Sequence, residues 1–327
     1  MRRWILARIG GGCAALVLVG AAPQPAAGQS LDQQWSYCEN QNHAYTADLQ
    51  IGGCSAIIQS GGESQGNIAI SFYNRGNAYQ TGLQPDYARA IADYTQAIAL
   101  NPQYAEAFYN RGNAYLDAPQ HDYARAIVDY TQAIALDPKY AEALVNRGNA
   151  YKDGPQHDYT RAIADYTKAT ALNPQLAAAF YARGNAYQTG PQPDYARAIA
   201  DDTQAIALDP KYADAFFDRG NAYAKDPQRD FVRAIADYTQ AIALNPNFAN
   251  AFNNRGRIGL KQQRWQAAWN DYNAAVQIDA AKALSIYGRG VAALRLGRTK
   301  EGQADLAAAA RLDATVATAY AADGITP

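Results

Sequence analysis

The chain has 327 residues and an almost balanced charge, with 29 lysines and arginines against 30 aspartates and glutamates. The formal net charge is −1 and no run of basic residues is long enough to attract a polyanion, which argues against nucleic acid as a partner. Alanine, tyrosine and leucine dominate over valine, which favours helices over strands.

Residues 1–28 have the pattern of a secretory signal peptide. Arg2 and Arg3 provide a basic start, and the apolar stretch CAALVLVGAA follows. Ala26 and Gly28 are small residues placed for cleavage before the next position. The sequence therefore predicts a protein exported to the periplasm or secreted.

A membrane anchor and a lipidated Cys13 are the alternatives for this segment. The apolar stretch is well short of the roughly 20 residues that span a bilayer. Cys13 lacks the Leu-small-small context of a lipoprotein cleavage site. After cleavage, 26 basic and 30 acidic residues would remain, so we expect a mildly acidic protein without a membrane span.

Residues 29–68 are predicted to form a degenerate N-terminal helix pair. Cys38 and Cys54 are the two cysteines left after cleavage, and an even number in an oxidising compartment favours one disulfide over two free buried thiols. The loops around them contain IGGC and SGGESQG, which indicate a weak core. A crosslink would give such a small unit a few kcal/mol of stability.

The rest of the chain is an internal repeat. The hexapeptide NRGNAY occurs at 74–79, 110–115 and 146–151, and an Arg-Gly pair continues the series at steps of 36 residues and then one step of 34. These spacings predict seven repeats over residues 69–314, five of 36 residues and two of 34, followed by a short cap helix over 315–327. The repeat glycines are Gly76, Gly112, Gly148, Gly184, Gly220, Gly256 and Gly290.

Each repeat is predicted to contain two helices. In residues 105–117 the apolar positions recur every three or four residues, which indicates a first helix, helix A. Residues 121–138 show the same period and indicate helix B, with Asp122 placed as its N-cap and Pro138 closing the unit. The fold class is therefore all-α, an αα-hairpin solenoid. Equivalent N-caps are Asp86, Asp158, Asp194 and Asp230.

This pattern resembles the tetratricopeptide repeat (TPR) family, in an exported bacterial form. The positions that carry the resemblance are Phe108, Gly112, Tyr115, Ala126, Tyr130, Ala133 and Pro138. The two extra residues of the long copies fall in the connector between helices A and B, and the LNP and LDP endings argue against Sel1-like repeats. The resemblance implies a right-handed superhelix with a concave groove lined by helix A, which in this family holds a protein or peptide ligand.

Asparagines flank the repeat glycines at positions that the resemblance places in the groove. An asparagine amide both donates and accepts, so it could pair with the backbone of an extended peptide whatever the peptide's side chains. The alternatives are that these asparagines only solvate the groove, or that the repeats are recent duplications. The ladder consists of Asn74, Asn77, Asn110, Asn113, Asn146, Asn149, Asn185, Asn221 and Asn254.

Aromatic residues stand three positions before several glycines, and we expect them either to anchor a ligand or to pack in the core. They are Tyr73, Tyr109, Tyr181 and Phe217. The chaperone-binding carboxylate clamp of the family needs lysine and arginine at such groove positions, and Glu106 and Glu142 stand there instead.

The repeated arginine is expected to form a salt bridge between helices A and B rather than to contact a ligand. The predicted pairs are Arg75 with Asp93, Arg111 with Asp129, Arg147 with Asp165, Arg183 with Asp201 and Arg219 with Asp237. One repeat departs from the others, because Asp202 replaces the helix B tyrosine. We expect poorer packing in that repeat.

Catalytic and metal chemistry is poorly represented. The chain has three histidines, no Cys-His or His-Asp cluster at ligand spacing and no phosphate-binding glycine loop. We therefore expect no enzyme activity, no cofactor and no metal. The predicted function is a protein-binding scaffold that holds an extended segment in its groove. The alternative is a structural or accessory subunit of a cell-envelope assembly or export complex, without a defined peptide site.

Overall fold

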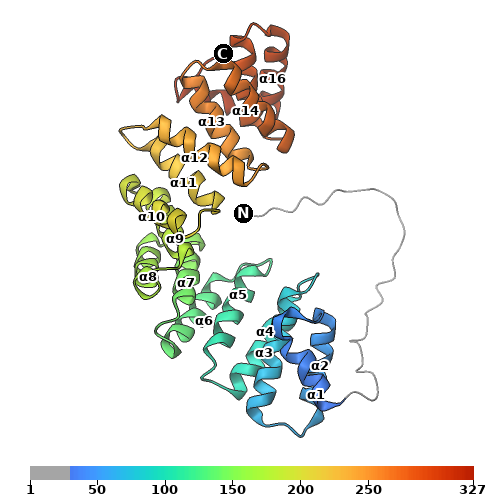
Figure 1. Ribbon diagram of the computed structural model, residues 1–327. Helices are drawn as coiled ribbons and strands as arrows, with labels where there is room; N and C mark the ends of the chain where they lie inside the picture. The colour runs from blue at the N-terminus through green and yellow to red at the C-terminus, as the bar shows by residue number, and fades with distance from the viewer. Residues whose placement is uncertain (1–29) are drawn as a thin grey trace, which may run out of the picture. The chain divides into compact units, whose positions relative to one another are not determined.

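The computed structural model describes residues 30–327, so the predicted signal peptide and Cys13 lie outside the described residues. The described chain folds into seventeen α-helices and one short 3-10 helix, with no strand between residues 30 and 327 (Figure 1). The all-α prediction is confirmed. Within this range, no helix is both long and apolar enough to cross a membrane. The described residues divide into two compact units, 30–114 and 115–327, which we describe separately.

The first unit contains two antiparallel helix pairs and the start of a third. Each helix packs against the next one in the chain, α1 on α2, α2 on α3 and α3 on α4. The elements are α1 (Leu31–Glu39), η1 (Gln41–His43), α2 (Ala47–Ser60), α3 (Gln65–Thr81) and α4 (Tyr87–Leu100), and α5 (Ala105–Asp117) crosses into the second unit.

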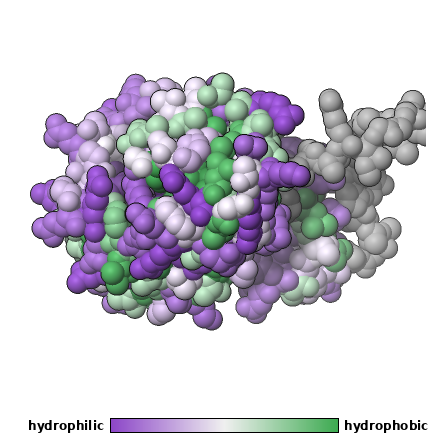
Figure 2. All heavy atoms as spheres, turned by 90° about the horizontal axis from the view of Figure 1, so that it is seen from above, coloured by the Kyte–Doolittle hydropathy of each residue, from purple (hydrophilic) through white to green (hydrophobic). Residues whose placement is uncertain are grey.

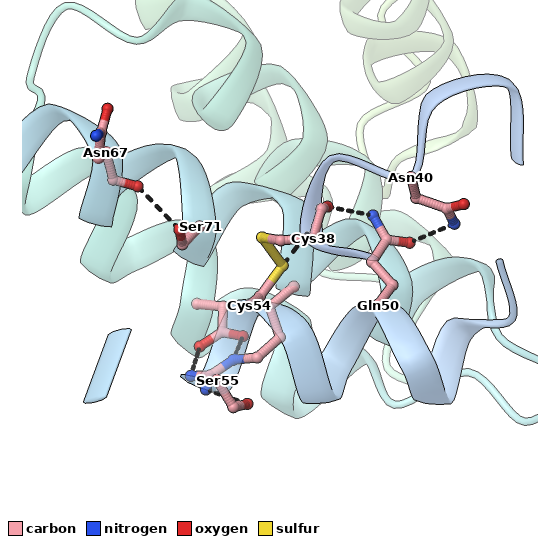
Figure 3. The surroundings of a disulfide bond; sticks show 9 residues. Cys38, Asn40, Gln50, Cys54, Ser55, Asn67 and Ser71 are labelled. Atoms are coloured by element: carbon pink, nitrogen blue, oxygen red, sulfur yellow. Dashed lines mark hydrogen bonds and ion pairs between the residues drawn. A yellow bond between two sulfur atoms is a disulfide. The ribbon is translucent and has the colours of Figure 1, made fainter. Parts of the chain in front are cut away.

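A disulfide between Cys38 and Cys54 joins α1 to α2, as predicted. Both cysteines are fully buried and form a small core with Ile57. Beside them, Gln50 Nε2 donates to the Cys38 carbonyl at 3.1 Å, and Gln50 Oε1 accepts from Asn40 Nδ2 at 3.0 Å (Figure 3). The crosslink therefore lies at the centre of the only apolar cluster that this short helix pair contributes among the described residues.

The second unit continues the same pattern of alternating A and B helices. Each helix packs on its neighbour in the chain, and helices A also contact the next helix A, as α7 does α9 and α13 does α15. Its elements are α6 (Tyr123–Leu136), α7 (Ala141–Asp153), α8 (Tyr159–Leu172), α9 (Ala177–Thr189), α10 (Tyr195–Leu208), α11 (Ala213–Lys225), α12 (Phe231–Leu244), α13 (Ala249–Lys261), α14 (Trp265–Ile278), α15 (Ala283–Arg295), α16 (Thr299–Leu312) and α17 (Val316–Ala321).

The connectors between helices A and B are closed by local hydrogen bonds. Asp122 accepts from the Arg125 backbone N–H through its side chain, and its own N–H donates to the Tyr115 carbonyl at 2.9 Å. All five predicted aspartate N-caps are confirmed by the same side-chain bond. His121 and His157 lie in these turns with a φ of +46°, and each is within hydrogen-bond reach of a carbonyl in the last turn of helix A. The described residues contain no cluster of side chains suited to a metal ion.

The repeat glycine allows helix B to approach helix A closely. A Cβ atom at Gly148 would lie 2.5 Å from Cε1 of Tyr166, and one at Gly76 would lie 2.7 Å from Cε1 of Tyr94. Both tyrosines are fully buried. The tyrosine ring thus rests directly on the backbone of helix A, in space that any side chain would take.

This contact predicts opposite outcomes for two glycine substitutions. Gly148→Ala should lower the free energy of unfolding by about 1–3 kcal/mol, because the new methyl group overlaps the Tyr166 ring. Gly52→Ala, in the interior of α2 with no atom within 4 Å of its Cβ position, should raise it by about 0.5–1 kcal/mol through helix propensity. Chemical denaturation measures both. A Gly148→Ala protein as stable as the wild type would show that the close approach is not required.

Candidate functional site

The residues predicted to line the groove all lie on helices A. Most of them are half-buried, so part of each side chain reaches the surface, and Asn221 is buried. On the face shown in Figure 2, hydrophilic residues are interspersed with smaller hydrophobic areas. The half-buried residues are Tyr73, Asn74, Asn77, Tyr109, Asn110, Asn113, Asn146, Asn149, Tyr181, Asn185, Phe217 and Asn254.

In three repeats, the asparagine after the glycine accepts a hydrogen bond from the hydroxyl of the buried helix B tyrosine. The tyrosine ring crosses from helix B over the glycine, and its hydroxyl then donates to the asparagine Oδ1. The distances are 2.8 Å from Tyr94 to Asn77, 2.7 Å from Tyr166 to Asn149 and 2.9 Å from Tyr238 to Asn221. The asparagine is therefore an acceptor for a hydroxyl on a buried ring, and the Tyr94 hydroxyl also lies 2.9 Å from Gln80 Oε1.

A second set of bonds links asparagines of adjacent repeats. Asn110 Nδ2 donates to Asn77 Oδ1 at 2.9 Å and to the Tyr73 hydroxyl at 3.0 Å. Asn254 Nδ2 donates to Asn221 Oδ1 at 2.7 Å. The amide groups of these residues are thus hydrogen-bonded to one another. Their role in ligand binding stays a prediction.

The groove aromatics also connect neighbouring repeats. Tyr73, Tyr181 and Phe217 each stack on an aromatic residue that immediately precedes the next helix A, and each remains half-buried. Ring centroids are 4.8 Å apart for Tyr73 and Tyr104, 4.8 Å for Tyr181 and Tyr212 and 4.7 Å for Phe217 and Phe248. At these positions the ring therefore packs between two repeats, and part of its edge stays accessible at the surface.

The predicted salt bridges between helices A and B are formed. Arg147 binds Asp165 through two parallel bonds of 2.8 Å, and its side chain is 18% exposed against 10% for the aspartate. Hydrogen bonding to Asp165 raises the pKa of Arg147. The predicted pair Arg111 with Asp129 joins residues of different units and stays a prediction. The confirmed pairs are Arg75–Asp93, Arg147–Asp165, Arg183–Asp201 and Arg219–Asp237, and Arg255–Asp271 and Arg289–Asp305 follow the same geometry.

Each of these arginines has a third polar partner, which the sequence analysis missed. Arg147 Nη1 donates to Thr131 Oγ1 at 3.0 Å, and Arg219 Nη1 donates to Thr203 Oγ1 at 3.1 Å. The threonine lies on helix B of the preceding repeat, sixteen residues earlier. The arginine therefore ties together three helices from two repeats. The recurrence of a threonine at that fixed spacing was the signal available in the sequence.

One repeat breaks this scheme at Asp202, where five of the other repeats have tyrosine and the last has Leu306. The side chain is fully buried, and neither carboxylate oxygen has a hydrogen-bond partner among residues 30–327. Burial, together with the nearby charge of Asp218, raises the pKa of Asp202 to about 9. This repeat therefore contains an unpaired buried acid, and the poorer packing expected for it stays a prediction.

The groove chemistry changes beside Asp202. Asn185, which has no tyrosine hydroxyl to accept, instead accepts from Lys152 Nζ at 2.9 Å and donates to Asp218 Oδ2 at 3.0 Å. Asp218 occupies a position that is asparagine in four other repeats, and burial raises its pKa. This part of the helix A face therefore has one acid, Asp218, where four other repeats have an amide.

Comparisons with known proteins agree with this architecture. A family model described as TPR repeat matches residues 84–118, 120–153 and 156–190, and one described as tetratricopeptide repeat matches residues 228–283. The segment between these matches contains Asp202. Among curated proteins, none matches the chain.

Several solved structures resemble the chain. A tetratricopeptide repeat protein from Parabacteroides merdae ATCC 43184 is 18% identical, covers 84% of this chain and 97% of its own, and has a TM-score of 0.56. The C-terminal part of a TPR repeat-containing protein from Cytophaga hutchinsonii is 15% identical, covers 79% and 99%, and has a TM-score of 0.58. YrrB, described as a TPR protein with an unusual peptide-binding site, is 23% identical and covers 61% of this chain and 95% of its own, with a lower TM-score of 0.47. The first two share the fold.

The buried acid predicts an unusual pH dependence. Because the folded state holds the Asp202 proton up to about pH 9 whereas an unfolded aspartate loses it near pH 4, stability should fall as pH rises through this range. Asp202→Asn, which cannot ionise, should remove that part of the fall and be more stable than the wild type at pH 8 by about 1 kcal/mol or more.

Urea denaturation between pH 5 and pH 9 measures the difference between the two proteins. Asp214→Asn, an exposed aspartate on the adjacent helix A, is the matched control and should leave the pH dependence unchanged. Parallel stability curves for the wild type and Asp202→Asn would contradict the raised pKa.

Proposed function

The chain belongs to the tetratricopeptide repeat family, and we propose that it is a non-enzymatic scaffold that binds an extended segment of another protein along helices A. The observation that carries the proposal is the set of half-buried asparagines and aromatics on the helices A of each unit, on α3 and α5 in the first unit and on α7, α9, α11 and α13 in the second. These side chains are fixed before a ligand arrives, because hydrogen bonds and ring stacking hold them. A ligand would therefore bind without first ordering the surface.

The chemistry of this row suits an extended backbone. Asparagine amides can supply both donors and acceptors to peptide N–H and C=O groups. Successive helices A in such an array are about 10 Å apart, which roughly three extended residues cover. We therefore propose that one amide hydrogen-bonds to the ligand backbone at about every third residue. The half-buried ring edges of Tyr181 and Phe217 contact ligand side chains between these hydrogen-bonded residues.

Affinity capture with a groove variant tests this proposal. Asn185→Ala with Asn254→Ala removes two amides from helices A of the second unit. We expect recovery of bound protein to fall about tenfold, since each lost hydrogen bond contributes on the order of 1 kcal/mol.

The matched control removes hydrogen bonds of similar number on helices B. Thr203→Ala with Thr239→Ala deletes the acceptors of Arg219 and Arg255 and leaves the helix A face intact. It should capture the same proteins as the wild type. Equal recovery by the groove variant, the control and the wild type would instead favour a structural subunit without a peptide site.

We also propose that the protein works in an oxidising compartment, the periplasm or the extracellular space. Support comes from the pattern of residues 1–28 and from the buried disulfide between Cys38 and Cys54. A structural disulfide of this kind is rare in a reducing cytosol.

Reduction should therefore destabilise the first unit. A crosslink between residues 16 positions apart is expected to contribute about 3 kcal/mol, so a reductant should lower the unfolding midpoint of the wild type. The variant Cys38→Ser with Cys54→Ser should already be destabilised and should not respond to the reductant. Thiol labelling of protein from the native envelope fraction provides the second readout. Full labelling of both cysteines there would contradict the proposed compartment.

A further inference from the structure

A pocket near the end of the array concentrates positive charge. It has a volume of about 330 Å³ and lies between α11 and α13, with the start of α12 on one side. Four basic side chains and one acidic one line it, in a chain whose formal net charge is −1. We call this the basic pocket, and its charged residues are Lys225, Arg229, Arg257, Lys261 and Asp323.

The charge arises where these repeats depart from the earlier copies. Lys225 and Lys261 each stand five residues after the repeat glycine, and Arg257 stands directly after it, in place of an asparagine. The earlier repeats have threonine or aspartate at the first of these positions, so the change adds positive charge or reverses a negative one. The earlier residues are Thr81, Asp117, Asp153 and Thr189.

One end of the pocket already holds a carboxylate from the chain itself. Asp323, which follows α17, forms ion pairs with Arg257 and, at 3.3 Å, with Lys261. Arg257 also donates to the Ala319 carbonyl at 2.9 Å, and its guanidinium lies 4.9 Å from the centre of the Tyr320 ring. This end of the pocket therefore binds a carboxylate beside an aromatic ring.

The other end carries two cations without a counter-charge. Lys225 and Arg229 are exposed and have no ion-pair partner among the described residues. Phe231 and Tyr238 form the apolar wall next to them. A carboxylate entering here would pair with the two cations, and the methylene groups of its side chain could lie against the rings.

We propose that the basic pocket binds an acidic stretch of the protein ligand, with one of its carboxylates between Lys225 and Arg229. This inference rests on the proposed function, because the pocket lies on helices A and would fix where an acidic stretch sits along the array. The pocket volume is in the range that accommodates a few side chains. The Asp323 carboxylate lies beside Arg257 and Lys261 at the other end of the pocket. It therefore neutralises part of their positive charge and takes up space that the ligand could otherwise fill.

A labelled octaglutamate peptide, with octaglutamine as its uncharged counterpart, tests the inference on the full chain. Fluorescence anisotropy at low salt should show binding of octaglutamate only, weakening as salt is added. Lys225→Glu with Arg229→Glu should weaken it at least about tenfold. Asp323→Asn should tighten it several-fold, because Arg257 and Lys261 become available.

The matched control is Lys139→Glu with Lys211→Glu, which changes the net charge equally at two exposed connector lysines. It should keep the wild-type affinity. Equal binding of octaglutamine, an equal loss in the control, or full displacement by an equimolar concentration of inorganic phosphate would overturn the assignment to an acidic peptide. Failure of octaglutamate to bind would overturn it too, and the proposed function would still stand if the array captured proteins through Asn185 and Asn254.

Discussion

The structure depends on one close contact, the ring of a helix B tyrosine resting on the glycine of helix A. At Gly148 the space beyond the α-carbon is filled by Tyr166, so the ring packs directly against the backbone of helix A. The same ring extends across the pair and places its hydroxyl on Asn149. Core packing and groove chemistry are therefore set by a single side chain, and a change in one alters the other.

Asp202 shows this coupling in the reverse direction. This repeat has an unpaired buried carboxylate in place of the tyrosine ring, and Asn185 forms hydrogen bonds with Lys152 and Asp218 instead. The arginine that joins helix A to helix B is retained there, since Arg183 still binds Asp201 at 2.8 Å. This arginine pairs with an aspartate of its own repeat and also donates to a side chain on the preceding helix B. The array is therefore continuous even where the core is altered.

The fold could be predicted from sequence because its determinants are local and repeated. Hydrophobic period, aspartate caps and the fixed spacing from Arg147 to Asp165 each lie within one repeat, and each is present in the structure. The amide network was not predicted, because it depends on how far a buried ring reaches. The contact of Asp323 with Arg257 was equally hidden, since it joins an unrepeated tail to a helix 66 residues earlier.

Differences among the repeats bear on recognition more than their likeness does. A ladder of identical asparagines would bind an extended backbone in any register, because a shift by one repeat restores the same contacts. Specificity needs positions that make one register better than the others. The acid at Asp218 and the cations at Lys225 and Arg257 supply such positions in adjacent repeats, and they give the helix A face a direction. A ligand that places its own charges in the complementary order would then be held in one register.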